Sequence, residues 1–254
     1  MTSVQRPSSR LVGVSTKMYF DIPTTKSYLS KVLSSLPSSL SARVFLLPDF
    51  VTLQYCVDTA AGSPLIIGAQ HTHHEDKGAF TGEVSPLVLA QAGAKFLEIG
   101  HAERRRLFAE TNDGVVAKCV AAARNKLTPL ICVGEVSKEG GEEKAVEECW
   151  EQVHAVFASI PKGSPVILAY EPVWAIGASQ PATPSHVVAV TQLLRQKCAK
   201  EVGWTGDDLT ILYGGSAGPG TYEKIKDGVD GLFLGRFAHD PAAFIRTIEE
   251  VQKA

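Results

Sequence analysis

The sequence places an acidic residue, Glu171, two positions after the apolar run at 166–169. Four consecutive apolar residues after Pro165 are typical of a strand covered on both faces, so this carboxylate leaves a buried strand at its end. Partial desolvation there raises the pKa of a carboxyl group towards neutrality, which suits a general base. Pro172 and Gly177 border a segment that can close over a small substrate. On this segment alone, a general base and a structural glutamate stay equally open.

Other chemically useful residues follow other apolar runs. His101 follows the run at 96–99, and Lys17 follows the run at 11–14. An imidazole donor and a carboxylate base together can remove a proton next to a carbonyl, while a lysine stabilises the charge that develops. Glycine turns at 214–216 and at Gly235 expose N–H groups that can bind phosphate. A plain tight turn and, for Lys17, a surface position are the alternatives.

The elements that must position these residues follow from eight short apolar runs. The runs lie at 11–14, 44–47, 65–69, 96–99, 129–133, 166–169, 209–213 and 231–234. Amphipathic segments separate them, and helix caps are expected at Thr183 and Asp240, each followed by a proline. Eight alternations favour an α/β fold with eight parallel strands ringed by helices, a (β/α)8 barrel, over an open doubly wound sheet. We expect one domain over 1–254, with a flexible N-terminal segment over 1–9.

The composition narrows the classes of function. A chain of 254 residues with 44% hydrophobic residues can bury a large core. The net charge of −2 and the absence of a long basic run argue against a nucleic-acid partner. No apolar stretch reaches the roughly 20 residues that cross a bilayer, so we expect no membrane association and a cytoplasmic protein. The five scattered cysteines indicate neither disulfides nor a zinc site.

Six stretches of the chain resemble the triosephosphate isomerase family, in the family's order. They are Lys-Met at 17–18, Gly-Ala-Phe-Thr-Gly-Glu at 78–83, Gly-His-x-Glu-Arg-Arg at 100–105, Ile-Cys-Val-Gly-Glu at 131–135, Ala-Tyr-Glu-Pro-Val-Trp-Ala-Ile-Gly at 169–177 and Tyr-Gly-Gly-Ser at 213–216. The resemblance implies a TIM barrel and an aldose-ketose isomerase of a small phosphorylated sugar, working through a cis-enediolate. It implies no metal and no organic cofactor.

The resemblance also implies roles for individual residues. Glu171 would move the proton, neutral His101 would polarise the carbonyl, and Lys17 would stabilise the charged intermediate. Glu103 would hold Lys17 or assist the proton transfer. The phosphate would be bound by three loops, through Gly177, Ser216, Gly235 and the backbone of Arg236. The segment 172–177 would close over the substrate and exclude water.

The same resemblance implies a homodimer through the loop at 71–81. In the family this loop inserts beside the partner's active site, and Thr81 would support that contact. The cluster His-Thr-His-His-Glu-Asp at 71–76 contains metal-binding residue types, but its spacing fits no standard ligand pattern. We therefore favour a polar interface loop over a metal site.

Four departures from the family pattern fall on the site itself. Ser15 stands where the family has the asparagine of Asn-x-Lys, which creates space beside the substrate. Ala102 replaces the serine after the histidine, and Ala-Ser-Gln at 178–180 replaces Thr-Gly-Lys at the end of the lid. Arg236 replaces the second glycine of the last phosphate loop and either binds substrate or points outward.

These departures are similar to motifs of a branch of the family, the L-erythrulose-1-phosphate isomerases. The triose reaction, from dihydroxyacetone phosphate to D-glyceraldehyde 3-phosphate, is the default expectation, and isomerisation of the four-carbon L-erythrulose 1-phosphate is the alternative. One extra hydroxymethyl-sized group changes discrimination by only roughly 1 to 3 kcal/mol, so size alone does not decide. An inactive barrel used for binding is a third reading, which the intact trio Lys17, His101 and Glu171 disfavours.

Overall fold

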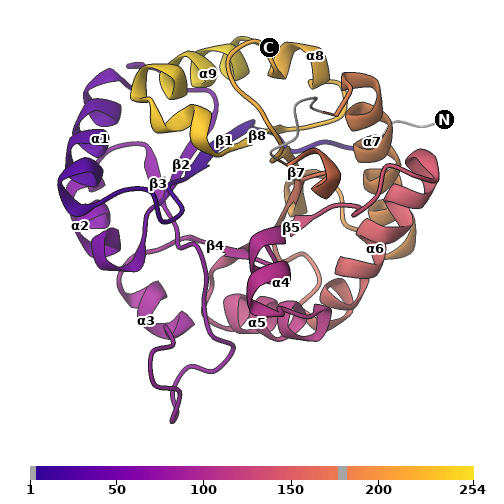
Figure 1. Cartoon of the computed structure of the whole chain (residues 1–254), viewed down its shortest axis with the longest axis horizontal. Helices are drawn as coiled ribbons and strands as arrows, with labels where there is room; N and C mark the ends of the chain where they lie inside the picture. Colours follow the sequence, from indigo (N-terminus) through magenta and orange to yellow (C-terminus); the bar gives the residue numbers. More distant parts are fainter. Residues whose placement is uncertain (1–3, 177–181) are drawn as a thin grey trace.

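The computed structural model describes residues 4–176 and 182–254 of the chain. In this part, eight parallel strands alternate with helices and form a ring, seen end-on in Figure 1. The strands are β1 (Leu11–Ser15), β2 (Arg43–Leu47), β3 (Leu65–Ile67), β4 (Phe96–Ile99), β5 (Thr128–Val133), β6 (Val166–Tyr170), β7 (Leu209–Tyr213) and β8 (Gly231–Leu234). Each predicted apolar run coincides with one of these strands.

Helices connect each strand to the next and cover the outside of the ring. The α-helices are α1 (Ile22–Ser35), α2 (Phe50–Ala60), α3 (Pro86–Gln91), α4 (Ala102–Phe108), α5 (Asn112–Arg124), α6 (Gly141–Ser159), α7 (Pro184–Glu201), α8 (Tyr222–Ile225) and α9 (Pro241–Lys253). Short 3-10 helices lie at η1 (Val173–Ala175), η2 (Gly206–Asp208) and η3 (Arg236–His239). Thr183 and Asp240 cap α7 and α9 through their side chains, as predicted.

The sheet closes on itself, which confirms the barrel and rules out the open sheet. The strand order is β3-β2-β1-β8-β7-β6-β5-β4, so only β3 and β4 remain to be joined. Ala69, just after β3, joins them by a parallel bridge to Leu97. The Ala69 N–H donates to the Phe96 carbonyl and the Glu98 N–H donates to the Ala69 carbonyl, both at 2.9 Å. Closure brings the ends of distant strands around one opening.

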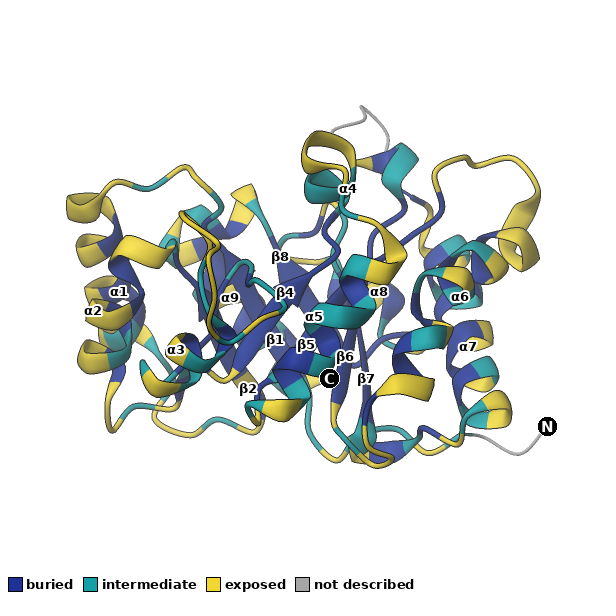
Figure 2. Ribbon diagram, turned by 90° about the horizontal axis from the view of Figure 1, so that it is seen from below, coloured by how far each residue is buried: buried dark blue, intermediate teal, exposed yellow. Residues whose placement is uncertain are grey.

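Alternate residues of each strand point into the barrel, where they form a core of their own. This inner core contains Leu11, Phe45, Leu47, Phe96, Leu130, Cys132, Ile167, Ala169, Leu212 and Phe233. A glycine is needed at 13, because a Cβ there would lie 2.2 Å from the ring of Phe45. Figure 2 shows the buried strands in dark blue, surrounded by helices whose outer faces are exposed.

The N-terminal segment makes specific contacts before β1 begins. Arg6 Nε donates to the buried carboxylate of Asp230 at 2.8 Å, and the Ser8 N–H donates to Asp207 at 2.7 Å. Residues 6 and 8 of the segment expected to be flexible are therefore bound to the barrel.

No helix in the described residues combines the length and apolar character of a membrane span.

Candidate active site

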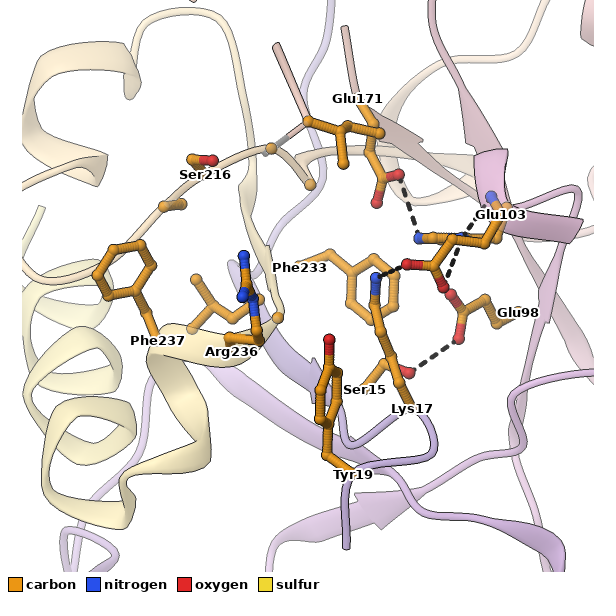
Figure 3. A pocket seen from close by; sticks show the side chains of 17 residues that line it. Ser15, Lys17, Tyr19, Glu98, Glu103, Glu171, Ser216, Phe233, Arg236 and Phe237 are labelled. Carbon is orange, nitrogen blue, oxygen red and sulfur yellow. Dashed lines mark hydrogen bonds and ion pairs between the residues drawn. The ribbon is translucent and has the colours of Figure 1, made fainter. Parts of the chain in front are cut away.

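A cavity of about 500 Å³ opens at the C-terminal ends of the strands, where the barrel fold was expected to place functional residues. Residues after β1, β4, β6, β7 and β8 surround it (Figure 3). Among the predicted site residues, those that line it are Ser15, Lys17, His101, Glu103, Glu171, Ser216, Gly235 and Arg236. Gly177 and the segment 178–180 lie outside the described residues. Barrel closure thus brings together residues up to 221 positions apart, from Ser15 to Arg236.

Glu171 follows β6 and projects into the cavity. Its backbone N–H donates to the Val133 carbonyl at 2.8 Å, which continues the sheet and fixes the position of its Cα. The side chain is buried, and its Oε2 lies 3.4 Å from Nε2 of His101. Burial, and secondly the charge of Glu98, raise the pKa of Glu171 to about 8, although Lys17 opposes this rise. The carboxyl group is thus tuned as a base for slightly alkaline solution.

The Glu171 side chain rests against the backbone of the loop after β7. A Cβ at Gly214 would lie 2.6 Å from both Cγ and Oε1 of Glu171. We therefore expect Gly214→Ala to fold but to displace the base, and a displacement of about 1 Å lowers kcat on the order of 10²-fold. The matched control is Gly218→Ala in the same loop, where the nearest atom lies at 3.6 Å. Steady-state kinetics check the pair, and equal kcat values would contradict this contact.

His101 is held by the start of α4 in one orientation. As the N-cap residue it accepts a hydrogen bond on Nδ1 from the Glu103 N–H at 3.1 Å. An accepting Nδ1 assigns the ring proton to Nε2, which faces Glu171 and the cavity. Burial, and then the charge of Lys17, lower the pKa of His101 to about 4. The imidazole is therefore a neutral hydrogen-bond donor.

Lys17 brings a positive charge into the cavity from the end of β1. Its backbone has φ 49°, in the left-handed region that few non-glycine residues adopt. Nζ donates to Glu103 Oε1 at 2.7 Å. Burial lowers the pKa of Lys17, but the hydrogen bond and charge of Glu103, together with the charges of Glu171 and Glu98, keep the pKa above its usual value. Lys17 is thus held as an ammonium ion.

The loops after β7 and β8 form the other side of the cavity. Ser216 and Gly235 line it, and the Arg236 side chain extends from η3 towards the interior (Figure 3). Arg236 therefore points into the cavity and not outward. Among the described residues its guanidinium makes no ion pair. A cation beside the turns of these two loops is suited to a phosphate group.

Three further residues of the lining were not predicted from the sequence: Glu98, within β4, and the aromatic residues Tyr19 and Phe237. Glu98 is buried and accepts a hydrogen bond on Oε2 from Ser15 Oγ at 3.2 Å. The signal was a single charged residue inside the otherwise apolar run 96–99. A charged residue there is costly unless it has a partner or a task.

Glu135, after β5, anchors the first described residues of the segment predicted to close over the substrate. Trp174 Nε1 donates to Glu135 Oε1 at 2.7 Å, and the Val173 N–H donates to the Glu135 carbonyl at 2.9 Å. The hydroxyl of Tyr170 bonds the same oxygen at 3.1 Å. Glu135 therefore holds η1 next to the cavity and takes no part in its lining.

The histidine-rich loop shows aromatic stacking. The rings of His73 and Phe80 lie 4.2 Å apart, and His71 Nε2 lies 3.7 Å from a carboxylate oxygen of Glu83. Within residues 4–176 and 182–254, no group of three or more His, Cys, Asp or Glu side chains is arranged to hold a metal ion.

Comparison with known proteins agrees with this geometry. The family model for triosephosphate isomerase matches residues 10–251. L-erythrulose-1-phosphate isomerases of Pectobacterium atrosepticum and Rhizobium etli are 46% and 35% identical to this chain, over 94% and 96% of it and 94% and 92% of their own lengths. A triosephosphate isomerase of Streptococcus agalactiae is 36% identical, over 93% of this chain and 96% of its own.

Proposed function

This chain belongs to the triosephosphate isomerase family and is an isomerase of phosphorylated sugars, and from that premise we propose that its substrate is L-erythrulose 1-phosphate. The observation that carries the proposal is the 46% identity to an L-erythrulose-1-phosphate isomerase over 94% of both chains. The triose substrate, the default expectation from the sequence, is the less well supported of the two, since the triosephosphate isomerase is 36% identical.

The residues of the cavity supply each step of such an isomerisation. The Glu171 carboxylate takes the proton from C3, and the electron pair of that C–H bond forms the C2–C3 double bond. The Nε2–H of His101 and the ammonium of Lys17 stabilise the oxygen charge on the enediolate. Glu171 then returns the proton to C2, while the O3 proton passes to O2 through His101. The carbonyl has moved from C2 to C3.

The two substrates differ by one substituent on the carbon that loses the proton. L-erythrulose 1-phosphate is dihydroxyacetone phosphate with CH2OH in place of one hydrogen there. With the triose the proton transfer yields an aldehyde, whereas with the tetrulose it yields a second ketose phosphate. The same residues serve both reactions, so only the space and the polar groups around that substituent select between them.

The experiment compares kcat/KM for L-erythrulose 1-phosphate and for glyceraldehyde 3-phosphate on the purified protein. Phosphorus NMR follows the tetrulose, because the phosphate lies beside a ketone in the substrate and beside a carbinol in the product. We expect a clear preference for the tetrulose. A preference for the triose would overturn this proposal and favour the triosephosphate isomerase reaction, which was the default expectation from the sequence.

Arg236 tests the phosphate end of the cavity, which both substrates share. Hydrogen bonds to charged groups contribute roughly 1.5 to 3 kcal/mol, so Arg236→Gly is expected to raise KM about 10- to 100-fold for both substrates. Arg236→Lys keeps the charge but loses the planar donors, so its KM should lie between that of the wild type and that of Arg236→Gly. An unchanged KM in Arg236→Gly would show that the Arg236 side chain does not bind the phosphate.

We also propose a homodimer through the loop at 71–81. Figure 1 shows the loop between β3 and α3 projecting beyond the ring of helices. Its Phe80 is 43% exposed and Met18, after β1, is 96% exposed, so both side chains offer apolar surface that a partner could cover. Light scattering of the purified protein tests the assembly.

The five cysteines are all free and buried, which supports the expected reducing, cytoplasmic location.

A further inference from the structure

Glu98 and Ser15 form a polar pair at the inner end of the cavity. Ser15 follows Leu11 and Gly13 on the inward face of β1, and Glu98 follows Phe96 on the inward face of β4. Both side chains line the cavity, and both residues are less than 5% exposed. Figure 3 shows them across the cavity from Ser216 and Arg236, the side suited to the phosphate.

The proton transfer does not use this pair. Glu171, His101 and Lys17 account for the base, the electrophile and the cation. The inner core of the barrel beside this pair is apolar, so a carboxyl group at 98 costs free energy that packing alone does not offset. A buried acid without a structural partner other than one serine hydroxyl points to a group on the ligand.

The free hydrogen-bonding capacity of Glu98 matches a hydroxyl group. Oε2 accepts from Ser15, and among the described residues Oε1 makes no hydrogen bond. Burial raises the pKa of Glu98 to about 8, although Lys17 opposes the rise, so near neutral pH the group is available as a donor as well as an acceptor. A substrate hydroxyl both donates and accepts, and the Ser15 hydroxyl turns to complete the arrangement.

We propose that Glu98 and Ser15 bind the hydroxymethyl group on the reacting carbon and so select a four-carbon substrate over a three-carbon one. With the phosphate at Ser216 and Arg236 and the reacting carbons at Glu171 and His101, a substituent on the far carbon extends towards this pair. This inference rests on the proposed function, because only a tetrulose phosphate carries that group.

The expected selectivity follows from what the triose leaves unpaired. A site built to hydrogen-bond a hydroxyl rejects an analogue without it by as much as roughly 10⁴- to 10⁵-fold. Here Glu98 and Ser15 bond each other in the empty site, so the discrimination is smaller, on the order of 10²-fold.

The test compares kcat/KM for L-erythrulose 1-phosphate and glyceraldehyde 3-phosphate in wild type, Glu98→Leu and Glu98→Gln. We expect Glu98→Leu to lower the ratio of tetrulose to triose kcat/KM on the order of 10²-fold, chiefly through the tetrulose KM. Glu98→Gln keeps two hydrogen-bonding atoms in the same shape and should lower the ratio much less. Ser15→Ala, which removes one hydroxyl, should fall between them.

The outcomes separate the inference from the function on which it rests. A wild type that turns over the tetrulose, with a ratio unchanged in Glu98→Leu, overturns the role of Glu98 and leaves the proposed function in place. A wild type without activity on the tetrulose overturns both. If Glu98→Leu fails to fold, as circular dichroism would show, the ratios in Glu98→Gln and Ser15→Ala decide, and unchanged ratios in both overturn the inference.

Discussion

Glu171→Gln is expected to lower kcat on the order of 10⁴-fold and to abolish exchange of the substrate's reacting proton with solvent. Glutamine has the shape of glutamate but does not accept a proton, and proton transfer by a positioned side chain contributes roughly 10²- to 10⁴-fold. The upper end applies because the only other carboxylates in the cavity, among the described residues, are Glu98 and Glu103, and Glu103 is bonded to Lys17.

Deuterium exchange in D2O, followed by proton NMR, measures this directly. KM should change little, because the amide fills the place of the carboxylate beside Gly214. Gly218→Ala is the control for a substitution in the loop after β7 that lies outside the cavity lining. Exchange that continues at the wild-type rate in Glu171→Gln would rule out Glu171 as the base.

The raised pKa of Glu171 also sets the pH dependence. Because only the ionised carboxyl group accepts a proton, kcat/KM should fall as the pH drops through about 8. The phosphate of the substrate titrates near pH 6, well below this limb. In the pH range of this limb Glu98, whose own pKa is about 8, is partly ionised, and its negative charge raises the pKa of Glu171. Glu98→Gln should therefore move the limb to lower pH, while the charges of Lys17 and Glu103 stay in place.

The sequence predicted the groups that lie at strand ends better than those within strands. Glu171, His101 and Lys17 each follow an apolar run, and in a parallel barrel the C-terminal ends of all strands meet at one opening. Knowledge of the fold was therefore enough to bring them together. Arg236 was placed at the opening as well, but the direction of its side chain depends on the packing of η3.

The place of Glu98 in the cavity could not be predicted from the sequence, for a physical reason. Its run of four residues is too short for alternation to show which side faces inward, and its partner Ser15 is 83 positions away. Only the closure of the barrel places the inward residues of β1 and β4 around one cavity. The contacts of Arg6 have the same origin, since Asp230 lies 224 positions further along the chain.

Lys17→Met is expected to lower the plateau value of kcat/KM by about 10²- to 10³-fold. Methionine keeps much of the length of lysine but loses the ammonium group, and removal of one donor to a developing oxyanion costs about that much. Glu103→Gln is the matched control. It removes the carboxylate that accepts a hydrogen bond from Lys17 at 2.7 Å, but it leaves the positive charge of Lys17 in place. Its loss should be smaller, since the amide oxygen still accepts from Nζ.

The pH profile separates stabilisation of the intermediate by Lys17 from its effect on the base. The positive charge of Lys17 lowers the pKa values of Glu171 and His101. Its removal therefore moves the acid limb of kcat/KM to higher pH, and this alone would depress the rate at pH 7. At a pH well above the limb Glu171 is ionised in both proteins, so any remaining difference reports the charge on the enediolate. If the wild type and Lys17→Met have the same kcat/KM there, Lys17 acts only by lowering the pKa of Glu171. The prediction that Lys17 stabilises the intermediate directly would then be wrong.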